Sequence, residues 1–413
     1  MAPRKMIAAF AAALSIGLSA LVSAADIYVA PTGTPQADGT RQKPLDLASA
    51  LSAKSPARPG DTIYLVSGRY DGPMKGIERV PFDLAVSGAA DKPVRIMPEP
   101  GGSAHLNGAA TLRSSHAHYI GLEIGDLDWD PRGQKHKVPT ALNVMGGKGA
   151  KVVNCNIFGG AMGTGLWSGA EDLEIYGCLI HDFGGLAESG RGHGHAFYTQ
   201  NERGTKVLKH NIAWRGCGWN VHVYTQAGQI NGFDIIENIC YIAGAYKPGQ
   251  TMDNYLISGY PPADRIRLIG NVGYQPCDAE QYRPNARLTS YRYVVNGAAQ
   301  VKDNYLMGAF YGLSLGRWQK IEVTGNTIWS TGILVEISSS TTGSAVPDRG
   351  EKPVLANYTV DRNTYYANGQ ATPFKYGSNE HLKDEERLSF EQWRGLGLDP
   401  NGKMLPGRNN KPD

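Results

Sequence analysis

Histidine and tyrosine side chains gather in two short segments near the middle of the 413-residue chain. The first, RGHGHAFYTQN, spans residues 191–201, and the second, VHVYTQA, spans residues 221–227. Four of the ten histidines lie between His193 and His222. Imidazole and phenol groups exchange protons in catalysis when their surroundings tune their pKa values. The predicted acid/base residues are His193, His195, Tyr198, His222 and Tyr224.

One reaction that such groups support is β-elimination in a polysaccharide that contains uronic acids. A base removes the proton at C5, a cation neutralises the adjacent carboxylate, and an acid protonates the leaving oxygen. Arginine and lysine suit the carboxylate, while aromatic side chains suit sugar rings. The predicted substrate-binding residues are Arg191, Arg215, Lys247, Arg283, Arg292, Gln200, Gln226 and Trp219, with Arg203, Arg287 and Trp214 nearby. The cluster and its neighbours therefore contain each kind of group that this elimination needs.

Two other functions stay open. Glycoside hydrolysis usually needs two carboxyl groups about 5 to 10 Å apart. The candidates Glu202, Glu237 and Asp253 lie only at the margins of the central strand-like segments. A non-catalytic glycan-binding or cell-surface protein would use the same cluster as an aromatic ladder. The hydrolase would release saturated sugars, and the binding protein would show no turnover.

Metal ligands are sparse in the sequence. Asp126, Asp128 and Asp130 alternate in GDLDWDPRG, which would place three carboxylates on one side of an extended segment. The segment lacks the sixth-position glycine and the closing glutamate of an EF-hand loop, so a solvated acidic loop is favoured over a calcium site. The zinc-binding patterns CxxC and HExxH do not occur. We expect no cofactor, with calcium at these aspartates as the alternative.

An internal repeat predicts the elements that position these residues. Its period is 22 or 23 residues plus insertions, which is typical of solenoid coils. An apolar residue followed three residues later by Asn recurs as Val153/Asn156, Leu208/Asn211, Ile235/Asn238, Leu268/Asn271, Val301/Asn304, Val323/Asn326 and Val360/Asn363, and Tyr176/Leu179 has the spacing without Asn. Short strand-like segments lie between these anchors, and alternate residues would face a shared core. The chain is predicted to be an all-β, single-domain right-handed parallel β-helix.

The repeat also predicts how neighbouring coils stack. The two Tyr-Thr-Gln triplets, residues 198–200 and 224–226, are expected to lie side by side, with His222 on the face of their tyrosines and glutamines. His195 falls on the opposite face unless the strand begins after it.

The recurring Asn residues are predicted to be structural. Asn tolerates left-handed backbone angles and hydrogen-bonds locally, and stacked Asn side chains could pair along a column. The same alignment puts Cys155 and Cys178 in register one coil apart. Strands about 4.8 Å apart allow a disulfide, but a stacked pair of buried thiols is the simpler interpretation.

These repeats, together with the opening segments IYVAPTGTPQADGTRQKPLDLASAL and GDTIYLVSGRYDG, resemble the pectate-lyase-like superfamily of right-handed parallel β-helix proteins. The resemblance covers nearly all of the chain after its first residues. It implies a secreted, carbohydrate-active protein, most simply a polysaccharide lyase, although this solenoid also hosts hydrolases, epimerases and phage tailspikes.

The sequence departs from the better-known members of that superfamily. The acidic calcium ligands and Lys/Arg pair of chondroitinase B and related alginate lyases have no match. Neither the arginine motif of pectate lyase nor the Asp-Pro-His-Asp of mannuronan epimerases is present, and similarity to polygalacturonase stops at residues 192–194. Any lyase activity would belong to a different subgroup.

The two ends of the chain and its net charge predict its location, its caps and its partner. Residues 1–24 have a basic start, an apolar run and small residues at the end, typical of a secretory signal peptide. We expect a secreted or periplasmic protein with no membrane span after signal removal. Residues 25–110 should form an N-terminal cap and first coils, 111–370 the β-helix coils, and 371–413 a C-terminal cap and tail that lays Phe390 and Trp393 over the last coil. A net charge of +3 from dispersed basic residues gives no indication of nucleic acid, so an acidic polysaccharide is the expected partner.

Overall fold

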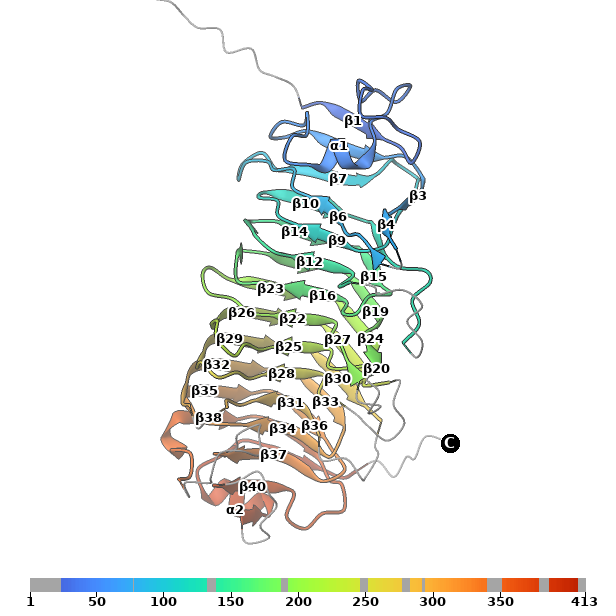
Figure 1. The fold of residues 1–413 in the computed structure, drawn as a ribbon. Coiled ribbons are helices and arrows are strands. Elements are labelled where there is room, and N and C mark those ends of the chain that lie inside the picture. Colours follow the sequence, from blue (N-terminus) through green and yellow to red (C-terminus); the bar gives the residue numbers. More distant parts are fainter. Residues whose placement is uncertain are drawn as a thin grey trace, which may run out of the picture.

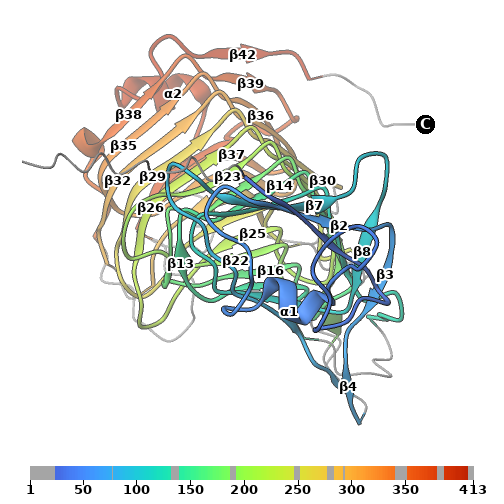
Figure 2. The ribbon, with the colours of Figure 1, turned by 90° about the horizontal axis from the view of Figure 1, so that it is seen from above.

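The protein is a right-handed parallel β-helix, in which three long sheets run side by side along one axis. The computed structural model describes residues 24–76, 78–131, 139–186, 192–245, 252–276, 283–291, 294–339, 351–378 and 386–407, so the expected signal peptide lies outside the described residues except for Ala24. Figure 1 shows the coils stacked from the blue N-terminal end to the red C-terminal end. Figure 2, seen from above, shows how each coil turns through the three sheets. The predicted fold class is confirmed.

Each sheet takes one strand from nearly every coil. Sheet 1 contains β1 (Asp26–Val29), β2 (Thr62–Leu65), β7 (Val94–Pro98), β10 (Ala117–Ile120), β14 (Lys151–Val153), β18 (Glu174–Tyr176), β23 (Lys206–Lys209), β26 (Ile230–Ile236), β29 (Ala263–Ile269), β32 (Asn296–Lys302), β35 (Trp318–Thr324) and β38 (Tyr358–Asp361). Sheet 2 contains β3 (Gly68–Asp71), β8 (Ala104–Asn107), β11 (Glu123–Gly125), β15 (Asn156–Phe158), β19 (Leu179–Phe183), β24 (Ile212–Gly216), β27 (Ile239–Ala243), β30 (Val272–Gln275), β33 (Tyr305–Gly308), β36 (Thr327–Trp329), β39 (Thr364–Tyr366) and β42 (Lys403–Leu405). Sheet 3 contains β6 (Phe82–Leu84), β9 (Ala110–Leu112), β12 (Leu142–Val144), β16 (Thr164–Leu166), β22 (Phe197–Thr199), β25 (Val221–Val223), β28 (Tyr255–Ile257), β31 (Pro284–Leu288), β34 (Tyr311–Leu315), β37 (Ile333–Ser338), β40 (Phe374–Gly377) and β41 (Arg387–Leu388).

The core lies inside the coils because successive strand residues point to opposite faces. In sheet 3, Val221 and Val223 of β25 are fully buried, and they pair in parallel with Tyr255 and Ile257 of β28. The residue between the two valines, His222, points to the outer face of the same sheet. Sheet 3 therefore supplies both core residues and an outward row of polar and aromatic side chains.

Each end of the solenoid is covered by a short helix. At the first coils, α1 (Leu47–Leu51) begins after Asp46, whose side chain accepts a hydrogen bond from the Ser49 amide, and buries Leu47 and Leu51. At the last coils, α2 (Phe390–Gly395) buries Trp393, which stacks on Phe374 with ring centroids 5.0 Å apart. These apolar contacts cover the core where no further coil would protect it. Among the described residues, no helix is long and apolar enough to span a membrane.

An internal ladder of amide side chains marks the turn between sheets 1 and 2. The Asn238 side-chain Nδ2 donates to Oδ1 of Asn271 at 3.0 Å, and the backbone amide of Asn238 donates to the same oxygen at 2.9 Å. The ladder consists of Asn211, Asn238, Asn271, Asn304, Asn326 and Asn363 and ends on Asp399. The predicted structural role of these residues is confirmed.

Two details of the ladder differ from the sequence prediction. The column continues to Cys178 and Cys155, not to the predicted anchors Leu179 and Asn156, so the repeat of the first coils was placed one residue too late. The left-handed backbone angle falls on the residue before each rung, as at His210 before Asn211. Asn is required there for its donors and acceptors, because its own backbone angle is ordinary. Cys155 and Cys178 are buried free thiols, as expected.

Candidate functional site

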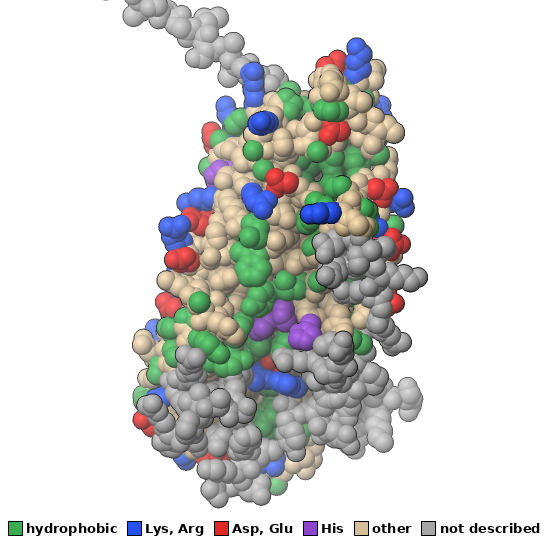
Figure 3. All heavy atoms as spheres, viewed as in Figure 1, with side chains coloured by type: hydrophobic (Ala, Val, Ile, Leu, Met, Phe, Trp, Pro, Cys, Tyr) green, Lys and Arg blue, Asp and Glu red, His purple; other side chains and the backbone are tan. Residues whose placement is uncertain are grey.

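The His/Tyr cluster lies on the outer face of sheet 3, at the strands β22 and β25. The register pairs Tyr198 with His222, not with Tyr224, so the two Tyr-Thr-Gln triplets are offset by two residues and the predicted stacking is wrong. The connection from sheet 3 to sheet 1 is longer after β25 than after β22, because Thr199 and Val223 are paired, as are Lys206 and Phe233. Because the offset is an even number, Tyr198, His222 and Tyr224 still share one face. Figure 3 shows histidine side chains (purple) gathered on this face at mid-height.

His195 belongs to the same face. Strand β22 begins at Phe197, after His195, which is the condition under which the sequence places this histidine on the Tyr198 side. The His195 ring lies 5.1 Å from Tyr198 and 4.5 Å from His222 between centroids. His222 Nδ1 and His195 Nε2 are 3.3 Å apart and share one hydrogen bond, so one imidazole donates to the other. The two histidines form a connected pair.

Aromatic rings surround this pair. Trp219 and Tyr224 both stack on the His222 ring, each with ring centroids 5.0 Å from it. The indole Nε1 of Trp219 is buried and finds no hydrogen-bond acceptor among the residues that the structure describes. A buried N–H usually has a partner. The Trp219 indole thus leaves a donor for a water molecule or a ligand atom.

Two glutamine side chains border the cluster on the side of Tyr224. Gln200 is half-buried one residue beyond β22, and Gln226 is exposed and hydrogen-bonded to Tyr224. Both lie at the edge of the face where the sequence predicted substrate contacts, and their roles stay predictions.

The surroundings set the protonation of the cluster. Burial lowers the pKa of His222 well below its ordinary value, and the neighbouring His195 and Arg287 lower it further. Burial, with a contribution from Tyr224, raises the pKa of Tyr198. His222 is therefore a neutral imidazole and Tyr198 a protonated phenol at neutral pH. A proton acceptor and a proton donor lie side by side, with ring centroids 5.3 Å apart.

A cation lies on the outer face of sheet 3, two strands to the C-terminal side of His222 and in register with it. The register runs from His222 through Leu256 to Arg287, and Arg287 is nearly buried. Its Nε and Nη2 lie 3.0 and 3.1 Å from the two carboxylate oxygens of the fully buried Asp253. Asp253 positions the guanidinium through one hydrogen bond, from Nη2 to Oδ1, and one ion-pair contact between Nε and Oδ2. In Figure 3 cationic side chains (blue) appear directly below the histidines.

A buried lysine supports the strand ends beneath the cluster. Lys206 Nζ donates to the carbonyl oxygens of Trp167 and Gln200 at 2.5 and 2.6 Å, and to that of Leu166 at 3.1 Å. Burial lowers the pKa of Lys206 to about 7. Lys206 was not among the residues predicted for the site, since an isolated lysine beside a turn normally faces solvent.

Several predicted residues lie away from this face. His193 is exposed in β21 (Gly192–His193), which pairs with β20 (Gly185–Leu186). Arg215 lies on sheet 2 and is ion-paired with Asp182. Arg283 is half-buried just before β31. Arg191, Lys247 and Arg292 lie outside the described residues.

The carboxylates considered for hydrolysis are dispersed. Glu202 is exposed in the turn after β22. Glu237 lies in the turn between β26 and β27, where its Oε2 is 3.2 Å from His210 Nε2. Asp253 is ion-paired with Arg287. These three carboxylates do not form a pair on the outer face of sheet 3.

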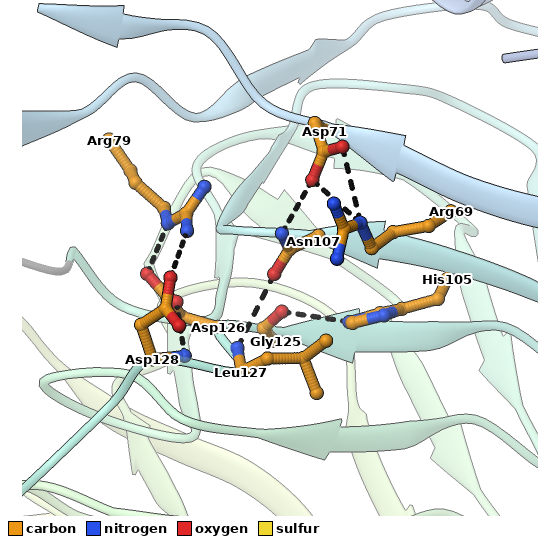
Figure 4. Close-up of polar contacts among 9 residues, drawn as sticks. All are labelled: Arg69, Asp71, Arg79, His105, Asn107, Gly125, Asp126, Leu127 and Asp128. Carbon is orange, nitrogen blue, oxygen red and sulfur yellow. Dashed lines mark hydrogen bonds and ion pairs between the residues drawn. The ribbon is translucent and has the colours of Figure 1, made fainter.

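The acidic segment at residues 126–130 meets an arginine. Figure 4 shows Arg79, at the end of β5 (Glu78–Arg79), reaching both Asp126 and Asp128. The Nε–Oδ2 distance to the buried Asp126 is 2.5 Å, and the Nη2–Oδ2 distance to Asp128 is 2.9 Å. The described residues include no group of three His, Cys, Asp or Glu that could hold a metal ion. The expectation of no cofactor, with calcium at Asp126, Asp128 and Asp130 as the alternative, stays a prediction.

Comparison with known proteins identifies the fold. No family model matches the sequence, and no curated protein matches it. Among solved structures, pectate lyase Pel9A is similar with a TM-score of 0.53 at 15% identity, covering 80% of this chain and 83% of its own. A rhamnogalacturonan lyase is similar with a TM-score of 0.53 at 14% identity, covering 82% of this chain and 87% of its own. At such low identity the likeness concerns the backbone alone, and the chain has the parallel β-helix fold of the pectate-lyase-like proteins.

Proposed function

We propose that the protein is an exported polysaccharide lyase that cleaves a uronate-containing polysaccharide by β-elimination on the outer face of sheet 3. The observation that carries the proposal is the meeting of His195, Tyr198, His222 and Tyr224 on one face, with Arg287 in the same outward row. The fold shared with two lyases is consistent with this function.

The roles follow from the protonation states. The pair of His195 and His222 accepts the C5 proton, since burial keeps His222 neutral. The C4–O bond breaks as a C4=C5 double bond forms, and the leaving oxygen takes the proton of Tyr198. Arg287 provides positive charge for the uronate carboxylate, and Asp253 orients it. His222 and Tyr198 are in the protonation states that their roles require at neutral pH.

The same geometry argues against a hydrolase. A hydrolase needs two carboxyl groups about 5 to 10 Å apart across the scissile bond. On the described part of this face, Asp253 is engaged by Arg287 and Glu336 is engaged by the buried Lys375. Each of these carboxylates is already bound to a cation, so the two do not form the pair across a scissile bond that hydrolysis requires.

The test is the ultraviolet absorbance of unsaturated uronates during incubation with a panel of acidic polysaccharides. We expect product with at least one of them and a loss of roughly 100-fold or more in the rate for Tyr198→Phe, the scale typical of a lost general acid. Tyr241→Phe is the matched control, because Tyr241 is a half-buried tyrosine on the outer face of sheet 2.

New reducing ends without absorbance would favour the hydrolase. Binding without either signal would favour a glycan-binding protein, and equal rates for Tyr198→Phe and Tyr241→Phe would remove the cluster from the mechanism.

A further inference from the structure

A tryptophan lies flat on the outer face of sheet 3, one strand to the N-terminal side of the acid/base cluster. Trp167 follows β16, and its indole Nε1 donates to Oδ1 of Asn143 at 2.5 Å. The edge of its ring system meets Tyr198, with centroids 5.6 Å apart and planes 81° apart. The indole is therefore fixed between Asn143 of the preceding coil and Tyr198 of the following one.

Glycine makes this position possible. A Cβ atom at Gly165 would lie 3.3 Å from the indole Nε1 and 2.9 Å from the Asn143 Oδ1 that accepts its hydrogen bond. The missing side chain lets the indole lie across the strand. Trp167 stays partly exposed, and Met145 beside it on the preceding coil is 42% exposed. In Figure 3 apolar side chains (green) continue upward from the histidines on this face.

The described side chains around Trp167 on the outer face, Thr140, Asn143, Met145 and Tyr198, carry no formal charge. The buried Lys206 lies beneath this face, where its Nζ is already bound to the carbonyl oxygens of Leu166, Trp167 and Gln200. Arg113, one coil further, is ion-paired with Asp83. The cation of the row, Arg287, lies four strands from Gly165, roughly 19 Å at the usual strand spacing.

This difference in charge selects between sugars. An aromatic face carries negative charge density and packs against apolar C–H groups, so it disfavours a carboxylate above it. On the described part of the outer face, no cationic side chain contacts the indole, so desolvating a carboxylate there would be costly. A neutral pyranose ring meets neither penalty.

We propose that Trp167 forms a binding subsite for a neutral sugar, so that the substrate alternates or mixes neutral sugars with uronates. The inference rests on the proposed function, which supplies the direction in which the polysaccharide runs along sheet 3. It adds the substrate class, since a homopolymer of uronates would place a carboxylate on the tryptophan. Asn143 acts as a positioning residue for the indole.

The experiment measures binding, which does not require turnover. Isothermal titration of the full-length Tyr198→Phe protein compares two matched pairs of hexasaccharides. The first pair is alternating galacturonate and rhamnose against galacturonate alone. The second is alternating glucuronate and N-acetylglucosamine against glucuronate alone. We expect at least one alternating hexasaccharide to bind about tenfold more tightly than its uronate partner.

Variants in the same background locate the preference. Trp167→Ala should abolish it, Trp167→Phe should keep part of it, and Trp214→Ala on sheet 2 should leave it unchanged. Arg287→Gln should weaken both members of a pair alike. Equal affinities within both pairs, no binding of either alternating hexasaccharide, or an unchanged preference in Trp167→Ala would overturn the proposal. A preference without any lyase product would reject the proposed reaction and keep the subsite.

Discussion

Replacing Asn271 by alanine should remove a rung of the internal ladder and destabilise the coils on both sides. The side-chain oxygen of Asn271 accepts from the backbone amide of Asn238 and from its Nδ2. Asn271 is fully buried, so water cannot replace the lost acceptor. Two orphaned donors at roughly 1 to 3 kcal/mol each give a loss of about 4 kcal/mol in the free energy of unfolding. That is a large part of the stability of an ordinary domain.

The assay combines denaturant unfolding with hydrogen exchange. The amide of Asn238 should exchange faster in Asn271→Ala, while amides near α1 should be unaffected, because contacts in a solenoid reach only neighbouring coils. Asn401→Ala is the control, since Asn401 is exposed and bonds only Asp361 among the described residues. An exposed substitution should change stability by less than about 0.5 kcal/mol. If Asn271→Ala behaves like this control and the Asn238 amide keeps its protection, the reasoning is refuted.

Three further predictions concern charge and pH. Burial, His195 and Arg287 keep the pKa of His222 low, so the acid limb of the pH profile of kcat/KM should lie below the ordinary histidine pKa. The limb should move to higher pH in Arg287→Gln, because that variant removes a positive charge. A limb that does not move would contradict the electrostatic coupling between Arg287 and His222. Lys206 has a pKa of about 7 in the folded protein against about 10.4 in an unfolded chain, so folding requires it to lose a proton between these values. The wild type should therefore lose stability relative to Lys206→Met as the pH falls from about 10 to 7, and a constant difference in denaturant midpoint would argue against the buried amine. Arg79→Ala should lower the melting temperature by several degrees because it leaves the buried Asp126 unpaired, whereas a chelator should leave the wild-type melting temperature unchanged.

The repeat could be predicted because its physical cause is local. Each rung needs an amide at one turn and apolar residues on either side, and this pattern survives insertions elsewhere in the coil. The one-residue error in the first coils arose where Cys155 and Cys178 replace the amide. A thiol carries no recognisable repeat signal, while the neighbouring Asn156 imitates a rung.

The location of the candidate site could be predicted from the sequence better than the residues that form it. The pairing of Tyr198 with His222 depends on the length of the connection between β25 and β26, which the repeat spacing does not determine. Arg287 could be chosen over Arg283 only by following the register from His222 through two parallel pairings. Lys206 had no sequence signal at all, since its amine is bound by two carbonyl groups of the preceding coil, those of Leu166 and Trp167, and by that of Gln200 in the turn before β23.

The amide ladder also has a polarity. Every rung from Asn211 through to Asn363 donates one side-chain N–H to the C-terminal neighbour, while its other side-chain N–H donates to a backbone carbonyl of the preceding coil. The last rung meets the carboxylate of Asp399, which accepts from Asn363 and from the hydroxyl of Tyr365. A carboxylate has no amide N–H to donate onward, so the chain of side-chain hydrogen bonds ends there. New coils could thus be added within the ladder in evolution without altering either terminus, whereas extension beyond Asp399 would first require this carboxylate to become an amide.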